Sequence, residues 1–299
     1  MRALVTGSEG FVARHLIRHL EMSGDVVVGV DRSVVDVTDL EQTRRAVGDA
    51  APEVIYHLAA LTHVGDSWAD PVEYTRVNVL GTKYVLDAAN DAAPESTVIV
   101  ISSADVYGVV REEDLPIAED FRVAPANPYA SSKVEAEHLA REAVRLRHQS
   151  VIVARPFNHL GPGQSTRFVV PALVSRLLEA VRDGAGTISV GDLSTRRDFT
   201  DVRDVVRAYR LLAHFGVSGE IYNVASGHDV LLADIAHQLV GLLAPEVRLV
   251  RDGRLTRPVE IPVMRGSFQR IHEATGWEPV IALSQSLNDV IEDLRTTLA

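Results

Sequence analysis

The sequence contains no cysteine, which excludes disulfide bonds and thiolate ligands for a metal. It has no apolar run approaching the ~20 residues that a membrane helix needs, and it begins "MRALVTG", without an apolar leader segment. Its 30 basic and 41 acidic residues give a net charge of −11 with no run of like charges, which argues against nucleic acid or a membrane as a partner. We therefore expect a soluble cytoplasmic protein.

What the chain has in quantity is apolar residues, 46% of 299, enough to bury a large core. In the first half, short β-branched runs alternate with stretches of helical period, and the runs are 3–7, 26–31, 54–60, 97–103 and 150–156. Continuous apolar strands between amphipathic helices are typical of a parallel sheet covered on both faces. The pattern predicts an α/β fold with a doubly wound parallel sheet of the Rossmann type.

After about residue 160 this alternation stops. The Pro/Gly-rich "GPGQ" is followed by the helical pattern "FVVPALVSRLLEAV" and by short segments near 187–190 and 221–224. We interpret residues 1–160 as the main domain, with returns to it from about 196–227, and residues 161–299 as mainly a smaller, interleaved C-terminal lobe.

The first strand leads into a turn with small residues at a fixed spacing. Gly7, Gly10 and Ala13 stand at i, i+3 and i+6, where they allow a tight turn, a close approach of a diphosphate and close packing of helix on strand. Asp31 ends the second strand and is placed to accept hydrogen bonds from ribose hydroxyls, which favours NAD. Its neighbour Arg32 could partly reverse that preference, so NADP stays possible. Residues 1–160 are therefore predicted to bind a dinucleotide.

Lysine is nearly absent from the chain, with two residues against 28 arginines, and one of the two is Lys133. It follows Tyr129 by four positions, so the two side chains share one face of a helix. A phenol has a pKa near 10 and shuttles protons poorly at neutral pH. A compact ammonium nearby stabilises the phenolate and can also donate to ribose hydroxyls. The broad, planar guanidinium of arginine would fit this double role less well than the ammonium of lysine.

Several segments together resemble a known family. They are "TGSEGFVARHL", "HLAALTHVGDSWADP", "VNVLGT", "SSADVYG", "YASSK", "RPFNHLGPGQ" and "RRDFTDVRDVVRAY". On these segments the chain is identified as a member of the extended short-chain dehydrogenase/reductases, the NAD-dependent epimerase/dehydratase family, whose members act on nucleotide sugars. "RPFNHLGPGQ", "FVVPALV", "RPVEIPVMRG" and "TGW" resemble most its reductases of GDP-linked sugars. The C-terminal lobe is then expected to bind the substrate.

The resemblance implies roles for individual residues. Tyr129 would give a proton to the sugar C4 oxygen, Ser103 would hydrogen-bond that oxygen, and Lys133 would tune the tyrosine. The implied cofactor site includes Phe11 and Val12 beside the glycines, and Asp36 and Val37 at the adenine. Leu58, Ala59 and Ala60 would line the cleft, and Asn78 would lie behind the active site. Pro156 and Phe157 would border the nicotinamide. The sugar diphosphate would meet Asn158, Arg197 and Arg257. The residues alone also allow purely structural roles: strand core for Leu58–Ala60, a strand end for Ser103, a solvated strand-end acid for Asp31, a surface amide for Asn78 and surface charges for the two arginines.

Three reactions share this apparatus: reduction of a 4-keto sugar, 4-epimerisation and 4,6-dehydration. Dehydration needs a further base and a further acid. In the sugar dehydratases that the chain resembles, these residues follow the serine directly; here Ala104 offers no acid, and Asp105 could act as the base. We expect hydride transfer from NAD(P)H to C4 of a nucleotide-linked 4-keto-6-deoxyhexose. The alternatives are an epimerase or dehydratase of the same superfamily and, more remotely, an inactive NAD-binding regulatory module.

Two further expectations concern metal and assembly. His57, His63 and His159 share no metal-ligand spacing, so we interpret them as packing or cleft-wall residues and expect no metal. By the same resemblance, the segments "VLGTKYVLDAAN" and "SSKVEAEHLAREAVRL" are expected to pair with their copies in a homodimer.

Overall fold

The computed structural model describes residues 1–255 and 261–298. Its largest element is a sheet of six parallel strands in the order β2-β1-β3-β4-β5-β9. The strands are β1 (Arg2–Thr6), β2 (Val26–Val30), β3 (Val54–His57), β4 (Thr97–Ile101), β5 (Ser150–Pro156) and β9 (Ile221–Val224). The predicted α/β fold class, with a doubly wound parallel sheet, is confirmed.

Helices cover both faces of this sheet because its strands carry apolar side chains on both. On β4, for example, Ile99 packs with α1 (Phe11–Met22) and α8 (Val202–Phe215), whereas Val98 and Val100 face the opposite layer. That layer is α2 (Leu40–Ala50), α5 (Gly81–Ala92) and α6 (Pro128–Arg147). Residues at i and i+2 of a strand point to the same side, so one β-branched run supplies two cores.

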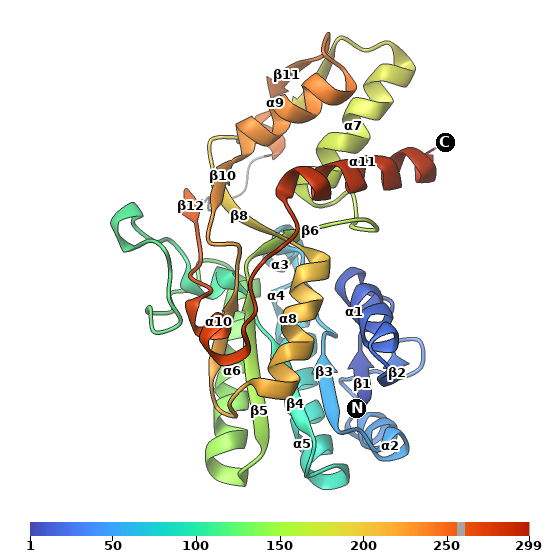
Figure 1. The fold of residues 1–299 in the computed structure, drawn as a ribbon, viewed down its shortest axis with the longest axis vertical. Coiled ribbons are helices and arrows are strands. Elements are labelled where there is room, and N and C mark those ends of the chain that lie inside the picture. Colours follow the sequence, from blue (N-terminus) through green and yellow to red (C-terminus); the bar gives the residue numbers. More distant parts are fainter. Residues whose placement is uncertain (256–260, 299) are drawn as a thin grey trace.

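A smaller lobe lies at one end of the sheet (Figure 1). Its strands are β6 (Asn158–Leu160), β8 (Arg196–Asp201), β10 (Asp229–Leu231) and β12 (Val263–Met264) in one sheet, and β7 (Thr187–Val190) with β11 (Arg248–Arg251) in another. Its helices are α7 (Val169–Asp183), α9 (Leu232–Leu243) and α11 (Leu283–Leu298). These elements enclose a separate apolar core that includes Leu173, Leu177 and Leu239.

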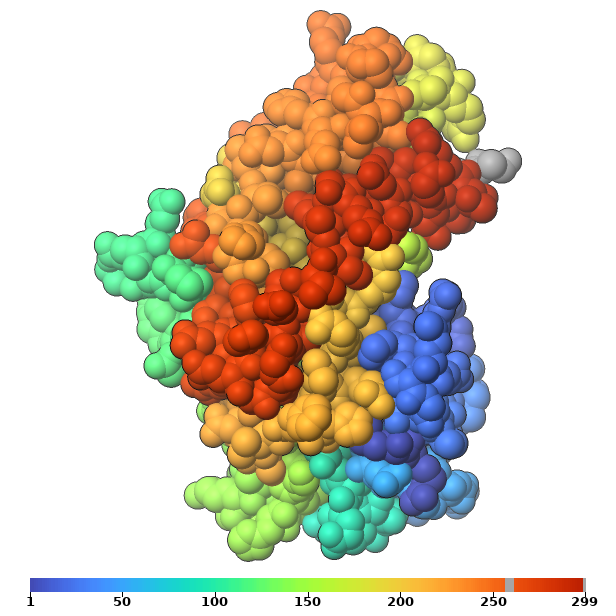
Figure 2. Space-filling view, in the orientation of Figure 1, coloured from blue at the N-terminus to red at the C-terminus, as the bar shows by residue number. Residues whose placement is uncertain are grey.

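The chain passes between sheet and lobe several times. It leaves the sheet after β5, returns as α8 and β9, leaves again, and returns once more as α10 (Gln269–Thr275) before ending in α11. Figure 2 shows the C-terminal part of the chain running from the lobe down over the sheet domain. Asp204 anchors the last crossing, because its carboxylate accepts hydrogen bonds from the backbone of Val280 and Ile281, both at 2.9 Å.

Short helices complete the fold. They are α3 (Val64–Ala69), α4 (Pro71–Tyr74), a π-helix (Thr75–Leu80) and three 3-10 helices, Ala104–Tyr107, Glu112–Asp114 and Gly253–Leu255. In the part of the chain that the structure describes, no helix combines the length and apolar character needed to cross a bilayer.

Candidate active site

A cleft of about 310 Å³ opens where the carboxyl ends of the sheet strands meet the lobe. In open α/β sheets, ligands bind at this edge. The cleft wall includes most of the residues that the sequence singles out: Gly7, Gly10, Phe11, Val12, Leu58, Ala60, Ser103, Asp105, Tyr129, Lys133, Pro156, Phe157, Asn158 and Arg197. Because Met264 also lines the cleft, segments as far apart in the chain as Gly7 and Met264 meet around one space.

The glycine turn lies at the floor of the cleft. Gly7 has φ of +70°, which favours glycine, and an added Cβ there would stand 2.9 Å from the backbone N and Cα of Ala59. Gly10 is the N-cap of α1, and its N–H donates to the Gly7 carbonyl at 2.9 Å. A Cβ on Gly10 would lie 3.0 Å from that same oxygen. The backbone is therefore open at a helix N-terminus, where a diphosphate binds.

Asp31 lies beside this turn, at the end of β2. Its Oδ2 accepts a hydrogen bond from the Glu9 N–H at 3.1 Å, and its Oδ1 accepts one from the Arg32 N–H at 2.7 Å. Neither Asp31 nor Arg32 is part of the cleft wall itself. The carboxylate is nevertheless held next to the glycine turn, and the residues present fit a dinucleotide.

Four further expected cofactor residues also lie outside the cleft wall: Asp36, Val37, Ala59 and Asn78. The Asp36 carboxylate accepts from the backbone and the hydroxyl of Thr38, at 2.9 and 2.7 Å. Val37 is buried and would touch a Cβ on Gly81. The Asn78 amide is buried in the π-helix and binds both backbone groups of Leu61.

Asn78 also connects the cleft to the helix that carries the tyrosine. Its Nδ2 donates to Ser132 Oγ at 2.9 Å, one residue before Lys133. That helix, α6, has Asn127 as its N-cap, whose Oδ1 accepts from the Ala130 N–H at 2.8 Å, and Pro128 in its first turn. The cap and the amide thus fix where Tyr129 and Lys133 stand.

Ser103, Tyr129 and Lys133 come together in the cleft. Tyr129 is buried, and the Ser103 hydroxyl is near enough to lower its pKa. Lys133 is also buried; its Nζ donates to the Ile101 carbonyl at 2.9 Å and lies 5.9 Å from the centroid of the Tyr129 ring. Ser103 Oγ also accepts from the Asp105 N–H at 3.1 Å, at the start of the 3-10 helix.

The electrostatics differ from the sequence expectation in one respect. Burial raises the pKa of Tyr129, the Asp105 charge raises it further, and the Ser103 hydroxyl lowers it. The helical spacing predicts that Lys133 lowers this pKa, but burial of the phenol raises it and the Lys133 charge is not among the causes of the shift. Burial also lowers the pKa of Lys133 to about 8, while Glu137 raises it. At neutral pH the site therefore holds a protonated phenol beside a charged ammonium.

The cleft wall contains residues that sequence reasoning did not assign to the site, including Arg167 and Tyr209. Arg167, in "GQSTRF", donates to Asp66 Oδ2 at 2.5 Å and so connects the lobe to the rim of the sheet domain. Tyr209 is fully buried on α8, and its hydroxyl has no partner among the residues the structure describes. In the sequence both sit in ordinary helical or loop contexts, and no local pattern marks them.

The three histidines have different surroundings. His57 is buried between the hydroxyls of Thr6 (2.9 Å) and Thr82 (3.1 Å), whereas His63 and His159 line the cleft. Within residues 1–255 and 261–298, no three His, Asp or Glu side chains are grouped so that they could hold a metal. Arg257 lies outside the described residues.

The chain is similar to known proteins over nearly its whole length. Residues 3–225 match the model of the NAD dependent epimerase/dehydratase family. The chain is 39% identical to GDP-6-deoxy-D-mannose reductase of Pseudomonas aeruginosa over 98% of this chain and 96% of that protein. It is 31% identical to UDP-glucose 4-epimerase of Mycolicibacterium smegmatis over 99% of each.

Among solved structures, RMD from Pseudomonas aeruginosa complexed with NADPH superimposes with a TM-score of 0.88 at 35% identity, covering 99% of this chain and 100% of that one. The chain belongs to the NAD dependent epimerase/dehydratase family, which confirms the family resemblance seen in its motifs.

Proposed function

We propose that this protein is a nucleotide-sugar reductase that uses NADH or NADPH to reduce the C4 carbonyl of a nucleotide-linked 4-keto-6-deoxyhexose, with GDP-4-keto-6-deoxy-D-mannose as the substrate. The observation that carries the proposal is the buried Tyr129 phenol, which shares the cleft wall with Ser103 and is protonated at neutral pH. Reduction of a carbonyl needs a proton donor of this kind. The naming of the Pseudomonas relative as a GDP-6-deoxy-D-mannose reductase supports this choice of sugar.

The cofactor would be held by the glycine turn, with Asp31 beside it for the ribose and with Val12, Pro156 and Phe157 along the cleft. When bound, it supplies the hydride. The lobe would bind the sugar nucleotide, with Asn158 and Arg197 at the diphosphate, a group that suits a guanidinium.

The protein's own residues account for the proton. Ser103 would hydrogen-bond the C4 oxygen of the sugar, and Tyr129 would donate its hydroxyl proton to that oxygen. Proton donation leaves a phenolate, and the charge of Lys133, 5.9 Å from the ring centroid, would favour it. Burial makes this charge more effective, because the local dielectric constant is low.

A second candidate is 4,6-dehydration, and the position of Asp105 favours it. This carboxylate lies in the cleft wall directly after Ser103 and Ala104, and its charge acts on Tyr129. It could serve as the base that removes a sugar proton. The position of the matching acid, however, is occupied by Ala104, which has no acidic group. The redox state of the nicotinamide distinguishes reduction from dehydration. Reduction of the sugar oxidises the nicotinamide, whereas dehydration leaves it in its starting redox state after turnover.

The test is single-turnover mixing. Protein loaded with NADH or NADPH is mixed with GDP-4-keto-6-deoxymannose, and we expect nicotinamide absorbance to fall by one equivalent per site. The matched control is Tyr129→Phe, which should bind the nucleotide with little change but lose turnover by about 10²–10⁴-fold. Unchanged absorbance in the wild-type protein, or full turnover in the variant, would contradict the proposal.

We also propose a homodimer formed through α5 and α6. A groove beside these helices is lined by Trp68, Pro71, Thr75, Val79 and residues of α6, and the Val72 side chain near it is 75% exposed. A second copy would cover this apolar surface. Sedimentation showing only a 32.6 kDa species at micromolar concentration would contradict the dimer.

A further inference from the structure

A buried ion pair lies behind the active site. Arg155 on β5 donates from Nε to Glu137 Oε1 at 2.8 Å and from Nη2 to Glu137 Oε2 at 2.6 Å. The exposed fractions are 1% for Arg155 and 2% for Glu137. A pair this buried is costly to desolvate, and apolar side chains of the same volume often stabilise a fold as well or better. Stability alone therefore does not account for it.

The pair is tied to the strand ends that form the cleft. Ser102, next to the predicted catalytic serine, donates from Oγ to Glu137 Oε1 at 2.5 Å. Arg155 donates from Nη1 to the Tyr107 hydroxyl at 2.9 Å and also lies 4.8 Å from that ring. The Tyr107 hydroxyl in turn donates to Asn223 Oδ1 on β9 at 2.7 Å. One carboxylate thus connects β4, β5 and α6 directly, and β9 through Tyr107.

Glu137 also stands one helical turn after Lys133. Residues four apart lie on the same face of a helix, so the carboxylate is close to the lysine side chain. The ammonium is fixed by the Ile101 carbonyl, at the end of the same strand that leads to Ser102. Burial lowers the pKa of Lys133, and the Glu137 charge opposes this.

Other titratable groups near Lys133 come from three elements, α6, β3 and β5. Tyr129 on α6 presents its ring, and burial raises its pKa, so the phenol is neutral. His57 on β3 is buried, and burial together with the Lys133 charge lowers its pKa to about 3. Arg155 holds the Glu137 carboxylate from β5. Glu137 is therefore the negative charge that acts on the ammonium.

We propose that Glu137 is a positioning residue of the active site: it fixes the serine end of β4 through Ser102 and keeps the Lys133 ammonium charged. The inference rests on the proposed reductase function, because that chemistry is what gives a charged Lys133 its use. Without Glu137, Lys133 would lose its proton nearer neutral pH and the phenolate would lose its stabilising charge.

The scarcity of lysine makes a direct measurement possible. Protein carrying lysine labelled with carbon-13 at Cε should give two resolved signals by NMR, from Lys83 and Lys133. The Lys83→Arg variant assigns them. Following the Lys133 signal against pH gives its titration midpoint without substrate, cofactor or turnover, so the result does not depend on the proposed function.

The main variant is Glu137→Gln with Arg155→Met, which removes both charges and leaves no buried ion unpaired. Of the two charges removed, only that of Glu137 is a cause of the Lys133 pKa shift. We therefore expect the Lys133 midpoint to fall by about one pH unit, the order expected when a charge within about one helical turn is lost. At pH 7 the lysine would change from about nine-tenths to about half protonated. Ser102→Ala removes a hydrogen bond but no charge, and should leave the midpoint in place.

The upper limb of the pH–rate profile for sugar reduction should move down with the midpoint. An unchanged Lys133 midpoint in the folded double variant would overturn the proposal, as would an equal fall in Ser102→Ala. If the wild-type protein reduces no sugar while the midpoint still shifts in the double variant alone, the proposed function fails and the action of Glu137 on Lys133 stands.

Discussion

Replacing Lys133 with methionine should abolish turnover and make the protein more stable. Burial lowers the pKa of Lys133 from 10.5 to about 8, with Glu137 opposing the shift. The folded state therefore holds the ammonium less favourably than the unfolded chain does. At about 1.4 kcal/mol per pH unit, this costs about 3 kcal/mol of folding free energy at pH 7.

Methionine removes this cost and also removes one hydrogen bond. The Ile101 carbonyl, which accepts from Nζ at 2.9 Å, loses its donor, at a cost of about 1–2 kcal/mol. Methionine has a similar length and no charge, so the site stays filled. The net expectation is a gain of about 1–2 kcal/mol in the free energy of unfolding at pH 7.

The difference in stability between the wild type and Lys133→Met should depend on pH. Because the folded-state pKa lies below the unfolded value, the unfolded chain binds more protons between pH 8 and about pH 10.5. Wild-type stability should rise with pH across that window relative to Lys133→Met. The advantage of the variant, measured by urea unfolding, should shrink by about 1 kcal/mol between pH 7 and pH 9.

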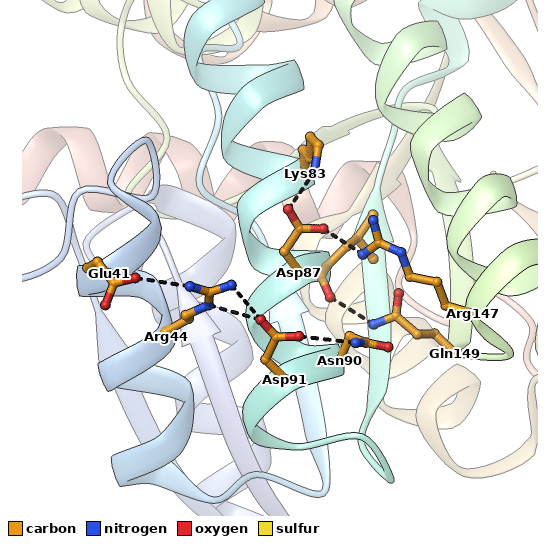
Figure 3. A network of polar contacts seen from close by, with 9 residues as sticks. Glu41, Arg44, Lys83, Asp87, Asn90, Asp91, Arg147 and Gln149 are labelled. Carbon is orange, nitrogen blue, oxygen red and sulfur yellow. Dashed lines mark hydrogen bonds and ion pairs between the residues drawn. The ribbon is translucent and has the colours of Figure 1, made fainter.

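The other lysine provides the control. Lys83 is 44% exposed on its side chain and pairs with Asp87 at 2.5 Å, in a surface network that also contains Arg147 (Figure 3). An exposed pair of this kind contributes about 0–1 kcal/mol. Lys83→Met should therefore lower stability slightly, with no gain at any pH. A Lys133→Met variant that is less stable than wild type at pH 7, or whose advantage is the same at pH 9, would refute the reasoning.

Three further predictions follow from local geometry. Arg32→Ala should weaken NADPH binding by about tenfold with little effect on NADH, because Arg32 follows Asp31 beside the glycine turn and could meet a 2′-phosphate; equal losses for both in titration calorimetry would count against this. Gly7→Ala should destabilise the fold by more than about 1 kcal/mol and abolish nucleotide binding, since φ is +70° and the new Cβ would stand 2.9 Å from backbone atoms of Ala59; thermal-shift assays would detect both effects, and wild-type binding would contradict it. Tyr56→Phe should raise the free energy of unfolding by about 1 kcal/mol, because the buried Tyr56 hydroxyl has no partner among the described residues; a loss in denaturant unfolding would show that the hydroxyl is satisfied.

The sheet and the glycine turn could be predicted from sequence because their signals are local. A run such as Thr97–Ile101 is apolar on both faces, and Gly7 and Gly10 are separated by a fixed spacing between a strand and a helix. The helical spacing of Tyr129 and Lys133 is equally local. These features need no knowledge of distant parts of the chain.

Long-range pairings could not be predicted. Glu137 has the appearance of a solvated helix acid in the sequence, and only the fold brings Arg155 against it. The direction of the Tyr129 pKa shift depends on how far the ring is buried, which the spacing to Lys133 does not reveal. Strands such as β12, with two residues, are too short to have a periodic pattern.

The repeated crossing of the chain has a consequence for how the protein is made and how it comes apart. The sixth strand of the sheet, β9, begins about 65 residues after the end of β5. During synthesis on the ribosome, the edge of β5 that includes Val153 and Ala154 is therefore unpaired until β9 emerges. A protease cut between 161 and 201 would not release an intact sheet domain, because its last strand is attached to the far fragment. Fragments ending near residue 160 should aggregate. The sheet domain and the lobe therefore have to be expressed or engineered as one chain.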